Sequence, residues 1–278
     1  MMKIGCGTVC FRDLPLEDAL RRIARAGYRW VETQATAPFC PHVDPWHDDP
    51  QAFKSLVADC GFEGVTALWA PHGAILADPD AVAGVSAAIQ WAQAAAIPVV
   101  NAGDGQKPKD MSEADALALL GERLSAILEV AERCQVFVAI EPHGTFSLTP
   151  AGLESIMGLS ASPWLGINYD TANVHRATYV ETAAGAYNWQ PVGESADEVA
   201  TLERVISRVV HCHVKDTIGA RSVALGEGEV DILGCLQVMQ KHGYEGVVSL
   251  ETEGEESPDE MQQMIERSRR YLERALRV

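Results

Sequence analysis

The chain alternates between two kinds of hydrophobic pattern, and the pair recurs eight times. Short runs rich in Val, Ile and Leu predict β-strands, and longer stretches with an apolar residue every three or four positions predict amphipathic helices. We expect strands near residues 3–8, 30–34, 64–71, 98–103, 136–143, 165–170, 209–216 and 246–253. We expect the helices that follow them near residues 16–27, 51–61, 81–96, 112–134, 150–160, 196–208, 232–243 and 259–276.

Local signals mark the ends of these helices. Ser112 and Ser257 each stand three residues before an acidic residue, which is the spacing of a capping box. Gly27 and Gly243 stand where helices should end. The strands lack a regular polar alternation, as is typical of parallel strands covered by helices on their faces. Eight such βα units in 278 residues predict an α/β fold, a single (β/α)8 TIM barrel domain over residues 1–278.

A doubly wound open sheet is the main alternative to the barrel. The sequence GCGTVC after the first strand lacks the third glycine of a dinucleotide-binding fingerprint, which weakens that alternative. Two connections are long, at about residues 35–50 and 176–196, and both follow strands. In a barrel both would lie over the active-site face, either as a lid over the substrate or as a contact between subunits.

Composition limits the partners that the protein can have. With 39 acidic and 22 basic residues the formal net charge is -17, which argues against nucleic acid and against membrane surfaces. The amino-terminal residues contain no apolar run long enough for a signal peptide, and the seven cysteines show no CxxC pair. We therefore expect a soluble, cytoplasmic protein with reduced thiols. The oligomeric state is not readable, so a homo-oligomer stays open.

Polar residues of the metal-ligand type end four of the predicted strands. Glu141, Asp170, His213 and Glu251 stand 29, 43 and 38 residues apart along the chain. A single such residue is more often a cap or an ion-pair partner, but closing the barrel would bring all four to one rim. Clustered carboxylates repel one another, so a shared divalent cation is the simplest explanation. Their oxygen and imidazole ligands suit Mn²⁺, which we take as the first candidate, and also Mg²⁺, Co²⁺ or Zn²⁺.

The run VVHCHVKDT holds two histidines, of which one is the better ligand candidate. Alternate residues of a strand share a face and each residue rises about 3.3 Å, so His211 should lie about 6–7 Å deeper than His213 in the barrel. His213, nearer the mouth, is the predicted ligand. His211 is expected to fill the layer below it as a hydrogen-bonded residue.

The segments IEPHG, NYDTAN, HCHVKD, ALGEGEVDI and VVSLETE together resemble the sugar phosphate isomerase/epimerase superfamily of xylose isomerase-like TIM barrels. This superfamily includes ketose 3-epimerases, L-ribulose-5-phosphate 3-epimerase and endonuclease IV. The resemblance covers nearly the whole chain. It implies that the same four strand-end residues bind the metal, and that Glu141 and Glu251 also act as the acid–base pair. It further implies that Arg221 and Glu227 reach the substrate.

One position departs from the pattern of the tagatose-type ketose 3-epimerases. Asn173 stands where those proteins usually carry a histidine, and in this the chain looks more like L-ribulose-5-phosphate 3-epimerase. His175, two residues later, could substitute for the missing histidine. The histidines of an endonuclease IV site are not found. The walls of the substrate pocket are expected to include His72, Asn173, His175 and Lys215, with Phe11, Trp69, Asn101 and His143 as further candidates.

The resemblance implies a metal-dependent proton transfer next to the carbonyl of a small sugar substrate. Return of the proton to the same carbon would epimerise it, and return to the neighbouring carbon would interconvert aldose and ketose. Loss of a β-hydroxyl would instead make the protein an inosose-type or keto-sugar dehydratase. A barrel that binds a sugar or metal without catalysis is the alternative from another class. The sequence leaves open whether the substrate is phosphorylated.

Overall fold

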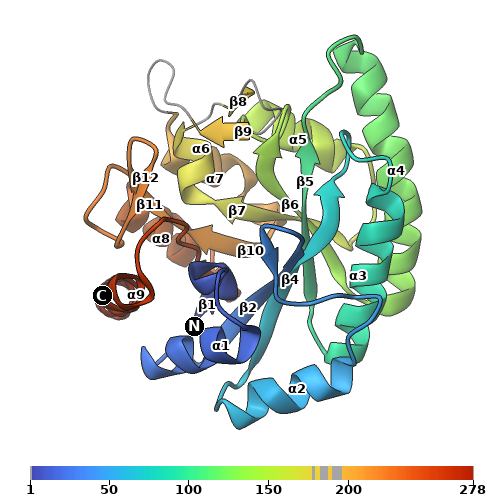
Figure 1. Cartoon of the computed structure of the whole chain (residues 1–278). Coiled ribbons are helices and arrows are strands. Elements are labelled where there is room, and N and C mark those ends of the chain that lie inside the picture. Colours follow the sequence, from blue (N-terminus) through green and yellow to red (C-terminus); the bar gives the residue numbers. More distant parts are fainter. Residues whose placement is uncertain (1, 177–178, 182–186, 190–195, 278) are drawn as a thin grey trace.

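The structure is a computed structural model that describes residues 2–176, 179–181, 187–189 and 196–277. Eight parallel strands form its central sheet, and the first of them pairs with both the second and the last, which closes the sheet into a barrel (Figure 1). These strands are β1 (Lys3–Gly7), β2 (Trp30–Thr36), β4 (Gly64–Ala74), β5 (Val99–Gly105), β6 (Phe137–Gly144), β7 (Leu165–Asp170), β10 (Val209–Val214) and β13 (Val247–Leu250). The predicted (β/α)8 barrel is therefore confirmed.

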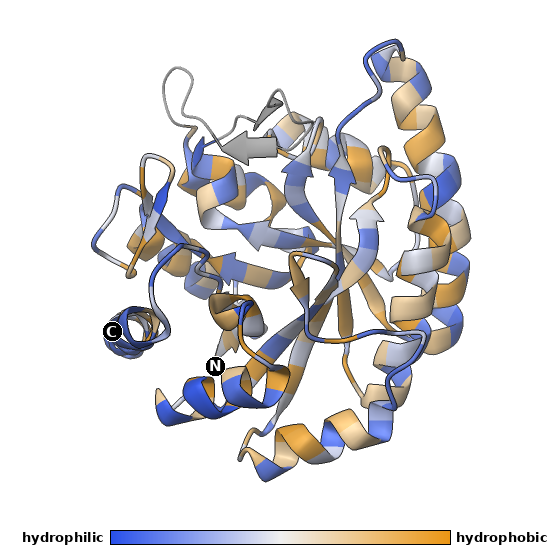
Figure 2. Cartoon of the chain, in the orientation of Figure 1, coloured by the Kyte–Doolittle hydropathy of each residue, from blue (hydrophilic) through white to orange (hydrophobic). Residues whose placement is uncertain are grey.

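The eight predicted helices surround the barrel (Figure 1). They are α1 (Leu16–Arg25), α2 (Pro50–Asp59), α3 (Ala81–Ala95), α4 (Glu113–Cys134), α5 (Pro150–Gly158), α7 (Glu198–Val205), α8 (Ile232–Lys241) and α9 (Pro258–Ala275). Figure 2 shows hydrophobic and hydrophilic residues interspersed along α3 and α4. The buried side chains of α4 include Leu120, Leu124 and Ile127, at the spacing that places them on one face. Burial of such faces against the strands holds the helices in place.

The local signals at the helix ends act as predicted. The hydroxyl of Ser257 accepts a hydrogen bond from the backbone of Glu260, whose side chain accepts one from the backbone of Ser257, so the capping box is complete. Ser112 caps α4 by accepting from the backbone N–H of Asp115. Gly27 follows α1 with a φ of 91°, a left-handed conformation that favours glycine.

Further short elements connect the strands and helices of the barrel. They are the 3₁₀ helices η1 (Thr8–Phe11) and η2 (Ile206–Arg208), the helix α6 (Thr171–Arg176), and the strands β3 (Cys40–Pro41), β8 (Tyr179–Glu181), β9 (Tyr187–Trp189), β11 (Asp216–Ile218) and β12 (Arg221–Val223). The prediction of one strand over residues 209–216 is wrong at its end, because β10 stops at Val214. Asp216 instead starts a hairpin, and its carboxylate accepts from the backbone N–H groups of Gly226 and Gly228.

The two long connections follow strands, as predicted. In the first, at about residues 35–50, β3 folds back antiparallel onto β2 and brings Phe39 over the barrel mouth. The second was expected at about residues 176–196, and most of it lies outside the described residues. Among the described residues, none of the helices is long and apolar enough to span a bilayer. The cytoplasmic location stays a prediction.

Candidate metal centre and substrate cavity

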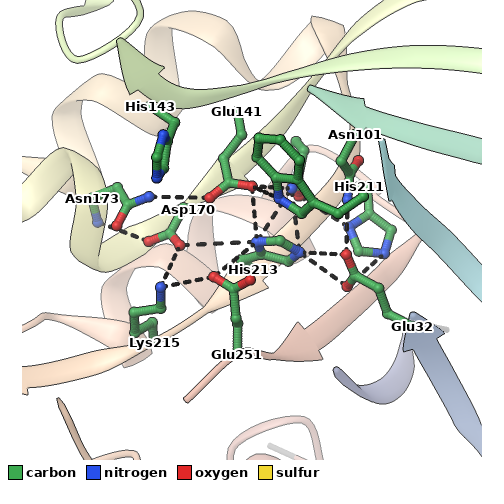
Figure 3. A network of polar contacts seen from close by, with 12 residues as sticks. Glu32, Asn101, Glu141, His143, Asp170, Asn173, His211, His213, Lys215 and Glu251 are labelled. Carbon is green, nitrogen blue, oxygen red and sulfur yellow. Dashed lines mark hydrogen bonds and ion pairs between the residues drawn. The ribbon is translucent and has the colours of Figure 1, made fainter. Parts of the chain in front are cut away.

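The four predicted ligands converge at the carboxyl ends of β6, β7, β10 and β13 (Figure 3). One ligand atom from each of Glu141, Asp170, His213 and Glu251 lies within 4.8 Å of the others, and all four residues are buried. Strands that are distant in sequence meet here because the closed parallel sheet aligns their ends. The structure thus brings together the set proposed from the sequence, and its role as a metal site is taken up below.

His213 lies at the centre of this cluster (Figure 3). Its Nδ1 atom is 3.3 Å from an oxygen of Glu141, 3.4 Å from one of Glu251 and 3.9 Å from one of Asp170. Its Nε2 atom lies 2.8 Å from Glu32 Oε1 on the opposite side of the ring. The ring therefore turns Nδ1 to the three carboxylates while Nε2 donates to a fourth.

Glu32, in β2, is a site residue that the sequence reasoning missed. Its side chain is 2% exposed, and Asn101 Nδ2 donates to its Oε1 atom at 2.8 Å. A glutamate in the middle of a predicted strand was the signal that could have identified it, because an isolated buried carboxylate is costly. Burial would raise the pKa of Glu32, but the neighbouring His213 and His211 outweigh it and lower that pKa.

His211 occupies the layer below His213, as predicted. The two ring centroids are 5.5 Å apart and the rings are nearly perpendicular. Nδ1 of His211 lies 3.0 Å from Asn168 Oδ1, and Nε2 lies 3.2 Å from Thr66 Oγ1. Desolvation by burial lowers the pKa of His211 to about 4. It is therefore a neutral, hydrogen-bonded residue of the barrel interior at neutral pH.

Three hydrogen-bond donors orient the carboxylate of Glu141, one of which is Asn168 Nδ2, at 3.1 Å from Oε2. Trp69 Nε1 donates to its Oε2 atom at 2.7 Å, and Asn173 Nδ2 donates to its Oε1 atom at 3.1 Å. On the other side of the cluster, Gln34 Nε2 donates to Glu251 Oε1 at 3.2 Å. Both predicted acid–base residues are thus held by neighbours from other strands and loops.

Lys215 places a buried ammonium group among the carboxylates. Its Nζ atom lies 2.7 Å from Glu251, 3.5 Å from Asp170 and 3.5 Å from Glu253. Burial would lower the pKa of Lys215, but Asp170 and Glu251 outweigh it and raise that pKa well above its ordinary value. Lys215 therefore stays charged and neutralises part of the cluster.

The environments of Glu141 and Glu251 differ. Burial raises the pKa of Glu141 to about 7, against the opposing effect of the nearby His213. Burial would also raise the pKa of Glu251, but the charges of His213 and Lys215 outweigh it and hold that pKa well below its ordinary value. Two carboxyl groups whose pKa values are pushed apart can serve as an acid and a base in one site.

These carboxylates open onto a cavity of about 140 Å³. Its buried lining residues are Gln34, Trp69, Glu141, Asn173, Lys215 and Glu251. The more exposed ones are Thr36, Phe39, His143 and Glu253. Of the predicted wall residues, Asn173, Lys215, Trp69 and His143 line the cavity, whereas Phe11 and Asn101 do not. Phe39 shows that the loop at residues 35–50 contributes to the mouth of the cavity.

The structure does not place Glu227 or Arg221 on this wall, contrary to expectation. Glu227 forms an ion pair with Arg267 of α9 at 2.7 Å, because Asp216 folds its loop outward against that helix. Arg221 lies in the hairpin strand β12 and is exposed. A motif match fixed their position in the sequence but not the direction of their side chains.

His175 and His72 also lie off the described cavity wall. His175 Nδ1 is 2.9 Å from Glu198, because α6 directs this side chain toward α7. His72 Nδ1 is 2.8 Å from Asp78, in the loop that leads to α3. Each imidazole is paired with a carboxylate in the structure, and the roles of these two residues as substrate contacts stay predictions.

The donor set fits a divalent cation. Three carboxylates and one imidazole nitrogen are ligands that such ions accept. The Oδ2 atom of Asp170 is buried and has no hydrogen-bond partner, although buried polar atoms are normally satisfied. A cation at the cluster would satisfy this atom and reduce the repulsion among the carboxylates.

Comparisons with known proteins agree with the fold. The sequence pattern of the family described as xylose isomerase-like TIM barrel matches residues 20–275. An uncharacterized protein of Methanocaldococcus jannaschii is 27% identical over 134 residues, which are 46% of this chain and 41% of that protein. The chain thus matches less than half the length of this curated relative.

Solved structures with the same fold include a D-tagatose 3-epimerase-like protein, with a TM-score of 0.78 and 19% identity. The alignment covers 99% of this chain and 97% of that one. The probable 3-DHS dehydratase of Bacillus anthracis has a TM-score of 0.74 and 17% identity, with 98% and 99% of the two chains covered. At these identities the likeness concerns the fold.

Proposed function

Because the chain belongs to the xylose isomerase-like TIM barrel family, we propose that it is a sugar isomerase or epimerase that depends on a divalent metal. The observation that carries this proposal is the convergence of three carboxylates and one imidazole within 4.8 Å, beside a cavity. The substrate is a small ketose or keto-sugar, and the reaction moves a proton on the carbon next to its carbonyl. The similarity to a D-tagatose 3-epimerase-like structure supports the same class.

Glu141, Asp170, His213 and Glu251 would hold the ion, with Mn²⁺ as the first candidate. When bound, it would act as a Lewis acid that polarises the carbonyl and makes the neighbouring proton removable. Nδ1 of His213 already faces the three carboxylates, so the four side chains would need little rearrangement to bind one ion.

Glu251 and Glu141 are proposed as the base and the acid. Glu251 is held ionised by Lys215 and His213, which suits it to take the proton from the carbon next to the carbonyl. Glu141, whose pKa burial raises to about 7, can hold the proton that is returned. Return to the opposite face of an enediolate inverts the carbon, and return to the neighbouring carbon gives aldose–ketose isomerisation. Trp69 and Asn173 keep Glu141 oriented for this transfer.

A dehydratase on the same site is the second candidate. The fold is shared with the probable 3-DHS dehydratase of Bacillus anthracis. The first step would be the same removal of a proton by Glu251, after which a β-hydroxyl leaves and the electron pair of the broken C–H bond forms a double bond. The proton on Glu141 could then accompany the departing hydroxyl as water.

The test is proton exchange in deuterated water. Protein loaded with Mn²⁺ should exchange the α-proton of at least one compound in a panel of ketoses, 3-keto-glycosides and inososes, as followed by NMR. Loss of water from an inosose would instead favour the dehydratase. Bound metal without exchange on any compound would favour a non-catalytic binding barrel and overturn the proposal.

Two variants test the assignment of the acid and the base. Glu141→Gln and Glu251→Gln should each lower the exchange rate by about 10²-fold or more. Exposed Glu255 provides a matched control, because Glu255→Gln makes the same charge change outside the cavity. Survival of full activity in either cavity variant would remove that residue from the mechanism.

A further inference from the structure

The cavity has little positive charge with which to bind an anionic substrate. Glu141, Asp170, Glu251 and Glu253 lie on it or directly against it. Lys215 is the one lysine or arginine among the described lining residues, and its ammonium group is already held by three of these carboxylates. A divalent cation at the cluster would be matched by the same carboxylates. No positive charge is left over for a phosphate group.

Two other cationic side chains that follow barrel strands, Arg12 and Lys107, do not line the cavity. The guanidinium of Arg12 donates to Gly254 O at 2.9 Å and lies 5.0 Å from the ring centroid of Phe39. Lys107 donates to the backbone oxygen of Met111 at 2.6 Å and is not a lining residue. Phosphate sites in proteins depend on such free cationic groups or on helix amino termini.

The long connection between residues 177 and 195 adds no positively charged side chain. Between residues 177 and 195 the sequence contains no Lys, Arg or His, but it contains two glutamates. His143 lines the cavity with its ring edge-on to Trp69, at 5.9 Å between the ring centroids. The cavity is therefore lined by hydrogen-bonding, aromatic and acidic groups.

Glu253 is the carboxylate best placed to act on the outer end of a substrate. It follows β13, lines the cavity, and keeps 33% of its side chain exposed, whereas Glu251 keeps only 5%. A terminal phosphate near the mouth would meet this carboxylate, whose cationic partner Lys215 is shared with Glu251 and Asp170. Like charges brought together in this way discriminate against the wrong ligand.

We infer that the cavity takes an uncharged keto-sugar and rejects the phosphorylated counterpart, with Glu253 as a residue that determines this specificity. The inference rests on the proposed function and adds the substrate class to it. A neutral polyol can use the Gln34, Thr36 and Asn173 side chains as hydrogen-bond partners and Phe39 as an apolar contact. A sugar phosphate would have to bury two negative charges beside carboxylates.

The experiment compares matched pairs of substrates on the full protein loaded with Mn²⁺. The pairs are D-tagatose with D-tagatose 6-phosphate, and L-ribulose with L-ribulose 5-phosphate. Exchange in deuterated water should give a kcat/KM about 100-fold or more in favour of the free sugar. Equal or better exchange on a phosphate would overturn this inference and leave the proposed function standing. Exchange on none of these sugars, nor on the wider panel, would count against both.

Variants then test Glu253 itself. Glu253→Gln should reduce the preference for the free sugar by about tenfold, chiefly through a lower KM for the phosphorylated sugar. Glu253→Asp keeps the charge and should keep the preference. Glu255→Gln removes an exposed charge two residues away and should leave the ratio unchanged. If the ratio of kcat/KM for free and phosphorylated sugar is the same in Glu253→Gln as in the unchanged protein, Glu253 does not determine the specificity.

Discussion

The carboxylate of Glu32 lies 2.8 Å and 2.9 Å from Nε2 of His213, through its two oxygens. This contact joins β2 to β10 inside the barrel, between residues 181 positions apart. Because Nε2 donates a proton to Glu32, Nδ1 is the nitrogen that faces the cluster and that would present its lone pair to a cation bound there. Histidines that bind metals commonly have such a carboxylate on the other nitrogen, which fixes the ring and its tautomer.

Glu32→Gln should therefore weaken the binding of Mn²⁺. Loss of the negative charge leaves His213 less firmly oriented and less basic, and an effect of about 10- to 100-fold on the dissociation constant is expected. Isothermal titration calorimetry on the purified variant measures it directly. The exposed change Glu255→Gln is the control. Unchanged affinity in Glu32→Gln would show that the contact has no role in metal binding.

Trp69→Phe should slow proton exchange while the metal stays bound. The variant keeps an aromatic ring but removes the N–H that donates to Glu141 at 2.7 Å. A hydrogen bond to a charged group is worth about 1.5–3 kcal/mol, so a fall in kcat of about tenfold or more is expected, with a smaller change in KM. Trp91→Phe removes a comparable bond, to the backbone of Asp48, outside the site and should leave kcat unchanged. Equal rates in both variants would contradict the positioning role of Trp69.

Lys215→Met should make the stability of the protein depend more strongly on metal. Without the ammonium group, Glu251 and Asp170 lose their nearby cation, and breaking a buried pair costs about 3–5 kcal/mol. Added Mn²⁺ should then raise the melting temperature of the variant more than that of the unchanged protein, as measured by calorimetry. Lys241→Met, which removes an exposed partner of Glu203, should show no such difference. If Mn²⁺ raised the melting temperatures of Lys215→Met and of the unchanged protein equally, Lys215 and the metal would not neutralise the same carboxylates.

Asp104→Asn should change how stability depends on pH. Asp104 is buried near the end of β5, accepts from Ser147 and the backbone of Phe146, and has its pKa raised by burial from 3.8 to about 6. Between these values the native state binds more protons than the unfolded state, so this group lowers stability as pH rises. Relative to that of the unchanged protein, the free energy of unfolding of the variant should rise by up to about 3 kcal/mol between pH 4 and pH 7. Urea denaturation at both pH values measures it, and a difference that is constant with pH would contradict the assignment.

Much of this protein could be predicted from hydrophobic periodicity and strand ends. The eight βα units followed from the pattern because parallel strands and their helices bury apolar residues in characteristic ways. Glu141, Asp170, His213 and Glu251 were found because each ends a strand, and a closed barrel must bring such ends together. The depth of His211 relative to His213 followed from the geometry of a single strand.

The tertiary structure decided which side chains meet across the barrel. Glu32 lies within a strand and gave no strand-end signal, so only the closed sheet revealed its contact with His213. His175 and Glu227 lie in segments near the motifs, yet they pair with Glu198 and Arg267 instead of lining the cavity. A sequence determines where residues stand along an element, whereas side-chain directions in loops and short helices depend on partners from distant parts of the chain.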